Sequence, residues 1–288
     1  MNTVHPILCG TDFSPQAAQA ADVAAALARR FGTSLVLTHS VDERGEIPAH
    51  LRPQFVGPAQ SQLTAEAARL RAAELPVEER LVSGWPDDGL QQVATHQHAG
   101  LAVVAASGHG ALGRWVLGSI AERLAESSPI PTLVVRHPAP LEEWLRGSSR
   151  LRILVGVDFT PQSQAALRWV GEFARLGSCV VTVAYVAQAH RGEPGHLVVD
   201  DALKAQLAAE AAQLLGFEPS TVFVCSGASR VDAQLLKLVE EIPADLLVVG
   251  THQWHGFQRL AHHSVSRRLL HESPVSVVCV PTPETKPA

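Results

Sequence analysis

A glycine-rich stretch in the first half of the chain contains residue types that can bind a phosphate group. It begins at Ala105, includes Ser107 and Gly108, and continues to Gly118, Ser119 and Ile120. Glycine lets backbone N–H groups approach an anion closely, and a helix beginning at Ser119 would add aligned donors and positive potential. The stretch therefore predicts an anion-binding loop that leads into a helix.

Known enzymatic phosphate motifs are excluded. Residues 108–113 match G-x-G-x-x-G, but they lie far from the first strand-to-helix turn and lack an acidic partner about 20 residues further on. No Gly-Lys-Ser/Thr sequence forms a Walker A loop, and G-x-S-x-G is absent. Without a Walker lysine or a paired base, any hydrolysis of a bound phosphate ester should be slow.

The chain is an internal duplication. Residues 7–16 (ILCGTDFSPQ) and 153–162 (ILVGVDFTPQ) are identical at seven of ten positions, at an offset of 146. Residues 101–104 match 246–249, and two Ser-Pro pairs are offset by 145. We therefore predict one domain over residues 1–138, a linker over 139–150 and a second domain over 151–288.

Each half alternates strand-like and helix-like segments. In the first half we expect helices over 15–30, 63–74, 89–98 and 119–126, and strands over 6–11, 34–40, 78–83, 101–106 and 132–136. In the second half we expect strands near 153–157, 180–186, 221–225, 246–250 and 275–280. This order predicts an α/β fold of two tandem, doubly wound, parallel five-stranded sheets with helices on both faces.

The last strand of each half is apolar and would be a hazardous free edge. Residues 131–135 and 274–280 are natural partners for one another, which predicts a pseudo-twofold internal dimer. Whether the chain forms a homodimer as well stays open.

The amino-acid composition argues against some classes of protein. The chain has 288 residues, 46% of them hydrophobic and 18% charged, with a net charge of −5. This balance favours neither nucleic acid nor an anionic membrane as a partner, and no apolar run approaches the roughly 18 residues of a membrane span. Four scattered cysteines and the absence of a signal-like start predict a cytoplasmic protein.

Several motifs together resemble the universal stress protein family in its tandem form. They are the repeated start with Asp12 and Asp158, the glycine stretch, the GSIAERL helix start at 118–124 and the Ser-Pro-x-Pro strand ending. The resemblance covers nearly the whole chain, twice. It implies an adenine nucleotide alpha hydrolase-like fold in each half.

Nucleotide-binding members of that family carry Gly-x2-Gly-x9-Gly-Ser/Thr after the fourth strand. The first half has Ala105, Gly108, Gly118 and Ser119 at this spacing, so one glycine is an alanine. The second half has Gly250, Gln253, His263 and Ser264, so two of the three glycines are bulky side chains. We expect the second phosphate site to be lost; whether the Ala105 methyl group permits binding stays open.

The resemblance also implies a ligand and its contacts. The ligand would be ATP or a related adenine nucleotide, with Mg2+ or Mn2+ bridging its phosphates, in a sensor or regulator linked to stress. Asp12, Ser40 and Val41 would face the adenine and ribose. The residues that would line the phosphates are Val104, Ala105, Ser107, Gly108, Gly118, Ser119 and Ile120.

Other interpretations remain. The chain could be a nucleotide-free scaffold that acts through an unknown protein partner, or a slow phosphohydrolase. Asp12 and Asp158 could simply cap the helices that follow them. The histidines His252, His255, His262 and His263 could bind a metal, but no carboxylate or cysteine completes a known motif, so a surface cluster is the simpler reading.

Overall fold

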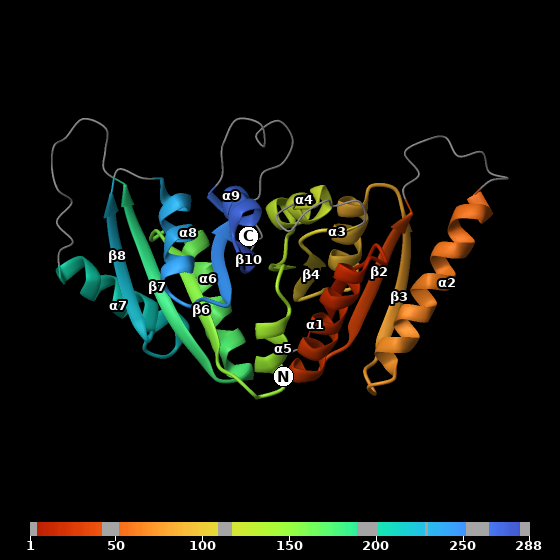
Figure 1. Ribbon diagram of the computed structural model, residues 1–288, viewed down its shortest axis with the longest axis horizontal. Coiled ribbons are helices and arrows are strands. Elements are labelled where there is room, and N and C mark those ends of the chain that lie inside the picture. The colour runs from red at the N-terminus through yellow and green to blue at the C-terminus, as the bar shows by residue number, and fades with distance from the viewer. Residues whose placement is uncertain are drawn as a thin grey trace, which may run out of the picture. The chain divides into compact units, whose positions relative to one another are not determined.

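The computed structural model describes residues 5–41, 52–108, 117–188, 201–227, 230–251 and 265–282. The chain divides into two compact units, Met1–Pro138 and Ala139–Ala288. Each unit holds five strands with helices between them (Figure 1). The doubly wound α/β fold predicted for each half is therefore confirmed.

In the described residues of the first unit, strands and helices alternate. They are β1 (Ile7–Gly10), α1 (Pro15–Phe31), β2 (Leu35–Val41), α2 (Arg52–Arg71), β3 (Val77–Ser83), α3 (Pro86–His96), β4 (Leu101–Ala105), α4 (Ser119–Ser127) and β5 (Thr132–Val135). The strand order is β3-β2-β1-β4-β5, and every neighbouring pair is parallel. The winding reverses between β1 and β4, which is where ligands bind in sheets of this kind.

The second unit repeats this order after a short helix. Its elements are α5 (Ala139–Leu145), β6 (Leu151–Val157), α6 (Pro161–Phe173), a 3-10 turn (Ala174–Leu176), β7 (Cys179–Gln188), α7 (Asp201–Leu215), β8 (Thr221–Gly227), α8 (Val231–Glu241), β9 (Leu246–Thr251), α9 (Val265–Glu272) and β10 (Ser276–Pro281). The strand order is β10-β9-β6-β7-β8, again parallel.

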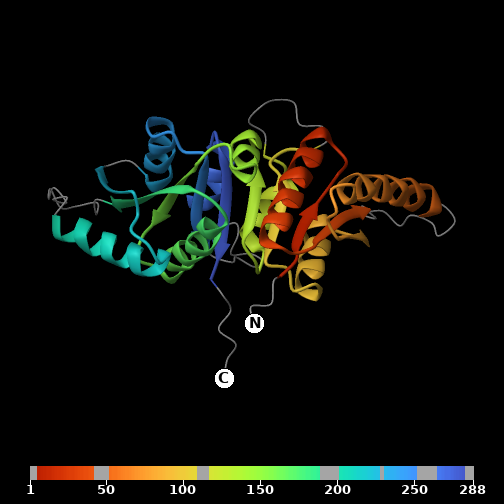
Figure 2. The same cartoon turned by 90° about the horizontal axis from the view of Figure 1, so that it is seen from below.

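Helices cover both faces of each sheet. In the first unit α1 packs with α2 on one face, and α3 packs with α4 on the other (Figure 2). In the second unit α6 pairs with α7, and α8 with α9. Helix α1 approaches the sheet closely because its inner face is mostly alanine, including the fully buried Ala20, Ala21, Ala24 and Ala28.

A glycine in the central strand sets the helix-to-sheet packing of both units. A Cβ atom on Gly10 would lie 3.0 Å from Leu90 and 3.2 Å from Val104. In the second unit a Cβ on Gly156 would lie 3.0 Å from Leu235 and 3.3 Å from Val249. The missing side chain therefore admits a leucine of α3 or α8 onto the sheet, at the same place in both copies.

Two segments differ from the sequence expectations. Helix α2 spans Arg52–Arg71 rather than the expected residues 63–74, and it contains Gly57 and Pro58. Residues 139–150, expected as a linker, contain α5, whose Leu141 and Trp144 are buried. Trp144 stacks on Phe173 of α6 at 5.0 Å between ring centroids, so this segment packs into the second unit. The pairing of residues 131–135 with 274–280 stays a prediction.

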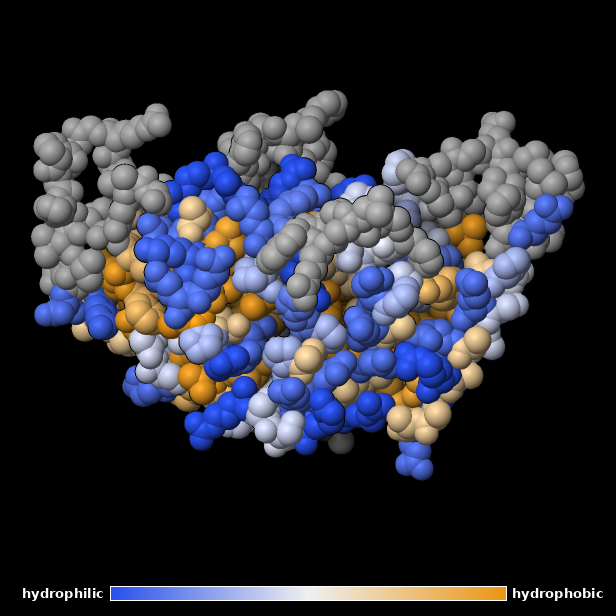
Figure 3. Space-filling model, viewed as in Figure 1, coloured by the Kyte–Doolittle hydropathy of each residue, from blue (hydrophilic) through white to orange (hydrophobic). Residues whose placement is uncertain are grey.

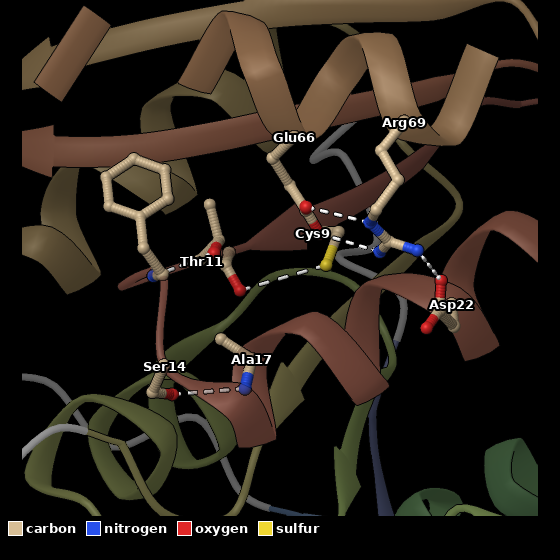
Figure 4. A network of polar contacts seen from close by, with 9 residues as sticks. Cys9, Thr11, Ser14, Ala17, Asp22, Glu66 and Arg69 are labelled. Carbon is tan, nitrogen blue, oxygen red and sulfur yellow. Dashed lines mark hydrogen bonds and ion pairs between the residues drawn. The ribbon is translucent and has the colours of Figure 1, made fainter. Parts of the chain in front are cut away.

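An ion-pair network ties α1 to α2 near the surface. The Arg69 guanidinium donates two hydrogen bonds to Glu66 on its own helix and one to Asp22 of α1, all within 2.9 Å (Figure 4). The hydrogen bonds that Arg69 donates to Glu66, and to a lesser extent to Asp22, raise the pKa of Arg69. Because the Arg69 and Asp22 side chains are nearly half exposed, this pair contributes little to stability.

The N-terminus of α1 is capped as expected, by Ser14 with Pro15 in the first helical turn. The Ser14 hydroxyl accepts a hydrogen bond from the Ala17 N–H at 3.1 Å (Figure 4). In the second unit Thr160 caps α6 in the same way, through the Ser163 N–H at 3.3 Å. Both caps fix the start of the helix that follows the central strand.

We predict that Ser14→Ala lowers the free energy of unfolding by about 1 kcal/mol, whereas Ser14→Gly lowers it by only a few tenths, or about 0.3 kcal/mol. The alanine variant leaves a buried N–H without its acceptor and favours the wrong backbone conformation. Urea unfolding followed by circular dichroism measures both. Equal stability of wild type and Ser14→Ala would contradict the capping role.

Candidate functional site

A cavity of about 390 Å³ lies at the edge of the first sheet where the carboxyl ends of the strands meet. Its walls come from the ends of β1, β2 and β4, from the start of α1, and from the N-terminal turns of α3 and α4. It therefore sits at the reversal of the winding, where the fold leads us to expect a ligand.

Nine of the ten site residues expected from sequence line this cavity. They are Asp12, Ser40, Val104, Ala105, Ser107, Gly108, Gly118, Ser119 and Ile120. The tenth, Val41, does not line it: its side chain is buried, and its carbonyl oxygen accepts a hydrogen bond from the Gly84 N–H at 3.1 Å.

Sequence reasoning missed nine further lining residues. They are Gly10, Thr11, Ala17, Thr38, His39, Pro86, Leu90, Leu117 and Ala121. Thr38, Gly10 and Val104 occupy one register across β2, β1 and β4, so the order of the strands is needed to bring them together. Pro86 and Leu90 enter from α3, which the sequence does not place beside the glycine stretch.

The N-terminus of α4 is built as an anion site. Its cap residue, Gly118, supplies no side-chain hydrogen bond, and the first bond of the helix runs from the Glu122 N–H to the Gly118 carbonyl at 3.0 Å. The N–H groups of Ser119, Ile120 and Ala121 therefore have no acceptor inside the helix. All three residues line the cavity, so the positive end of the helix dipole faces it.

Gly118 is a glycine that the protein's own packing does not require. Its backbone is extended, with φ −70° and ψ 140°, which any residue adopts. Among the described residues, a Cβ atom there would touch only the Ala106 carbonyl at 3.6 Å, an ordinary contact. The absence of a side chain instead leaves the approach to the α4 donors open.

Gly108, in contrast, is required by a neighbouring side chain. A Cβ atom on Gly108 would overlap the Oδ2 atom of Asp12. The other carboxylate oxygen of Asp12 accepts a hydrogen bond from the Ser14 N–H at 3.0 Å. The carboxylate thus lies between the end of β1 and the loop that follows β4.

The capping role of this aspartate is common to both units. Asp158 accepts hydrogen bonds from the Thr160 N–H at 3.2 Å and from the Thr160 hydroxyl at 2.5 Å. Phe13 and Phe159, which follow the two aspartates, share the left-handed φ of 62°. The Asp-Phe-Ser/Thr turn is therefore a structural feature, to which the first unit adds the contact with Gly108.

His39 lies in the cavity wall in a single tautomer. Its Nδ1 atom is 2.7 Å from the Thr11 carbonyl oxygen, which can only accept, so Nδ1 carries the proton. Its ring lies 4.3 Å from that of Phe13. Burial lowers the pKa of His39, and the Thr11 carbonyl and the Asp12 carboxylate oppose that shift. His39 is therefore neutral near pH 7.

A partly buried ion pair holds the two helix N-termini together. The Nε atom of Arg123 on α4 donates to Asp87 in the first turn of α3 at 2.9 Å, and its guanidinium lies 5.7 Å from the Trp85 ring. The second unit repeats the pair as Arg268 and Asp232, 3.3 Å apart. The two aspartates, and likewise the two arginines, lie 145 residues apart in the sequence. Sequence reasoning overlooked this signal of the pair.

The alanine in the glycine motif faces away from α4. Val104 points toward α3, because a Cβ on Gly10 would touch both Val104 and Leu90. Side chains alternate along a strand, so the Ala105 methyl group points toward α1 on the opposite face. At the equivalent Gly250, a Cβ would overlap the backbone of Gln162 in α6. This motif position therefore affects the packing of α1 and α6 against the sheet more than access to the α4 donors.

Other candidate chemistry receives little support. The four histidines from His252 to His263 lie outside the described residues, and within the described ranges no group of three His, Cys, Asp or Glu side chains could hold a metal. Burial raises the pKa of Cys9 to about 12 and of Cys179 to about 11, so both thiols stay protonated and unreactive. Of the helices in the described segments, none has the length and apolarity to cross a membrane.

Exposed large hydrophobic side chains are few in the described part of the chain: Trp85 and Phe217. Figure 3 shows hydrophilic side chains over much of the viewed face, with hydrophobic atoms in scattered small areas between them. Trp85 immediately precedes Pro86, so it stands close to the wall of the cavity.

We predict that Gly108→Ala destabilises the first unit by about 2 kcal/mol, because the new methyl group displaces the Asp12 carboxylate. In an Asp12→Ala background the same change should cost less than about 1 kcal/mol, since the obstructing atoms are gone. Denaturant unfolding of the four proteins measures this coupling. Gly118→Ala is the matched control and should cost only about 0.7 kcal/mol, the difference between glycine and alanine at an N-cap. An equal cost of Gly108→Ala in both backgrounds would refute the contact.

We also predict a pH-dependent contribution of His39 to stability. The folded-state pKa of His39 lies below the value near 6.5 that the unfolded chain has, so above pH 6.5 both states are neutral there. As the pH falls below 6.5 the unfolded chain takes up a proton that the folded protein resists, and stability falls. The stability of wild type relative to His39→Gln should therefore decrease between pH 7.5 and 5.0. A stability difference between the two proteins that does not change with pH would contradict this prediction. The other histidines do not affect the difference, because both proteins contain them.

Known proteins of one family are similar to this chain in sequence. The model of the universal stress protein family matches residues 3–136 and 150–281. A universal stress protein of Thermus aquaticus is 32% identical over 136 residues, covering 45% of this chain and 97% of that protein. One of Mycobacterium bovis is 27% identical over 295 residues, covering 95% of this chain and 96% of its own length.

A solved structure extends the likeness to the fold of the whole chain. The crystal structure of a universal stress protein from Archaeoglobus fulgidus superposes with a TM-score of 0.73 at 18% identity, covering 97% of this chain and 99% of that one. Because two successive segments match the family and together span most of the sequence, this chain belongs to the universal stress protein family as a tandem, two-domain member.

Proposed function

We propose that the first unit binds ATP or a related adenine nucleotide, and that the chain acts as a nucleotide-responsive regulator in a stress response. The observation that carries this proposal is the uncapped N-terminus of α4, which faces a cavity at the reversal of the sheet. Gly118 leaves that N-terminus accessible although the packing of the protein would accept a side chain there. Phosphate is the group that such an arrangement binds best.

The cavity has two chemically distinct ends. Its α4 end, beyond β4, offers backbone donors from Ser119 to Ala121. Its other end, at β2 and α3, offers Thr38, His39 and Ser40 beside the apolar Pro86 and Leu90. The two ends are separated by two strand spacings, roughly 10 Å, which suits a base at one end and phosphates at the other. An apolar wall with a few polar groups is typical of a base site.

The charges of the first unit favour binding over catalysis. Residues 1–203 contain no lysine, so the phosphates would be held by backbone N–H groups rather than by a side-chain ammonium. Mg2+ would accompany a triphosphate and reduce its repulsion from the nearby Asp12 carboxylate. We expect any hydrolysis to be slow, since no lysine lies among the described residues of the cavity wall.

The second unit keeps the frame of this site but not its lining. The residues equivalent to Thr38, His39 and Ser40 are Ala184, Tyr185 and Val186, at the same register of the sheet. The Phe159 and Tyr185 rings still meet, at 5.2 Å. We therefore propose one nucleotide per chain, with the second unit serving as a scaffold whose contacts with a partner protein respond to the first. We place this activity in the cytoplasm, where free thiols are stable.

We predict that ATP with Mg2+ stabilises the wild type, by about 2.7 kcal/mol when the nucleotide is at 100 times its dissociation constant. Gly118→Val should lose most of this stabilisation, because its side chain would cover the α4 donors. Its stability without nucleotide should fall by about 1 kcal/mol, because valine is a poorer N-cap residue than glycine. Thermal unfolding with and without ATP measures both quantities.

Two results would count against the proposal. No stabilisation of wild type by ATP, ADP, AMP or a cyclic adenine nucleotide would mean that the cavity is not a nucleotide site. Stabilisation that survives in Gly118→Val would place the nucleotide elsewhere.

A further inference from the structure

The outermost strand of each unit ends its sheet at an edge. Strand β3 is outermost in the first unit and β8 in the second, and in the described part of the chain no further strand pairs with either (Figure 1). An edge strand directs part of its backbone N–H and C=O groups away from the sheet, where another strand can bind them. Because the two units are copies of one sequence, a difference between their edges is informative.

The edge of the first unit is protected by charged side chains. Glu78, Glu79 and Arg80 occupy three successive positions of β3. Arg71 of α2 donates two hydrogen bonds to the Val77 carbonyl, at 3.1 and 2.6 Å, and pairs with Glu79 at 2.7 Å. Charges on an edge strand and a carbonyl that already has a partner both oppose the addition of another strand.

The edge of the second unit lacks this protection. Strand β8 has the sequence TVFVCSG, which contains no charged residue. The register of the two sheets makes Val222 the equivalent of Glu79. Phe223 likewise takes the place of Arg80. The last turn of α7 has no basic residue, so it cannot repeat the contact that Arg71 makes from α2.

The side chains of β8 are apolar and incompletely covered. Those of residues 222–225 are all partly exposed, on both faces of the strand, whereas Val183 and Ala184 of the neighbouring β7 are buried. Phe217, in the turn that leads from α7 into β8, is 38% exposed and is one of the few exposed large hydrophobic side chains in the described ranges. Association at this edge would remove apolar surface from water, which is favourable.

The direction of the backbone groups identifies the residues that can pair. The Pro76 carbonyl accepts a hydrogen bond from β2 at 2.9 Å, so the next residue, Val77, faces away from the sheet, where Arg71 binds it. Successive residues of a strand alternate in this respect, so Leu81 also faces outward. Its equivalent in β8 is Val224. Val224, at the middle of the strand, therefore presents its N–H and C=O groups to the outside.

We propose that β8 is an interaction edge for a second copy of this chain, and that the two β8 strands pair antiparallel about a twofold axis at Val224. The two Val224 residues then exchange both N–H···O bonds, and the sheets of two second units become continuous. The contact lies outside the cavity of the first unit, so it does not depend on the proposed nucleotide site.

A second copy is the occupant because the edge is complementary to itself. The twofold pairing sets Val222 opposite Ser226. It also sets Phe223 opposite Cys225, so no charge meets a like charge across the interface. The same operation at the centre of β3 would set two copies of Arg80 against each other, which is destabilising. The self-complementary edge is thus found on the unit whose edge lost its charges.

The test compares proline variants of the two edges. Proline has no N–H group, and at an outward-facing position of an edge strand it leaves the ladder to the neighbouring strand intact. Wild type, Val224→Pro and the matched control Leu81→Pro are studied as full chains by sedimentation velocity, at concentrations up to roughly 100 μM. Wild type and Leu81→Pro should form dimers with the same dissociation constant. Val224→Pro should dimerise at least about tenfold more weakly, because two symmetry-related hydrogen bonds are lost.

A second variant covers the case in which Val224→Pro does not fold, which circular dichroism reveals. Val224→Lys keeps the backbone and brings two positive charges together at the axis, so it should also weaken the dimer by about tenfold or more. A wild type that stays monomeric throughout the concentration range would overturn the proposal. A dimer that survives in the folded variants at Val224, or one that Leu81→Pro weakens as much as they do, would overturn it as well.

Discussion

The structure depends on the parallel pairing of β1 with β2 on one side and with β4 on the other. This pairing brings three strand ends to one edge, and the reversal of the winding there leaves room that no crossover helix fills. Gly10 and Gly156 allow the closest approach of a helix to this central strand, so that α3 and α8 pack directly beside the edge. The described residues that line the cavity of the first unit are placed by this arrangement.

Comparing the two units distinguishes the features that the fold requires from those that a ligand would require. Both keep the helix caps, the left-handed phenylalanine, the glycine of the central strand and the Asp–Arg pair between the last two helices. Within the described residues, the first unit has a glycine cap at its fourth helix, facing the cavity. Since the shared features suffice to fold the second unit, the glycine cap of the first supports the proposed binding site rather than the fold.

The sequence predicts the frame well and the cavity only in part. Ser14 and Pro15 marked the start of α1 because capping acts within one turn of helix. The internal repeat then fixed the element order, from which the parallel sheets follow. Thr38 and Leu90 were not predicted, since only the strand order and the packing of α3 bring them to the glycine loop. The predicted start of α2 was wrong, because the prediction rested on the helical spacing of apolar residues, and the helix begins about three turns earlier, at Arg52.

The central claim is that one of two duplicated units retains a nucleotide site. The most direct measurement is the number of ATP molecules bound per chain, by equilibrium dialysis with Mg2+ at nucleotide concentrations well above the dissociation constant. The account predicts one per chain. Two per chain would contradict the loss of the second site, and none would contradict the interpretation of the first cavity.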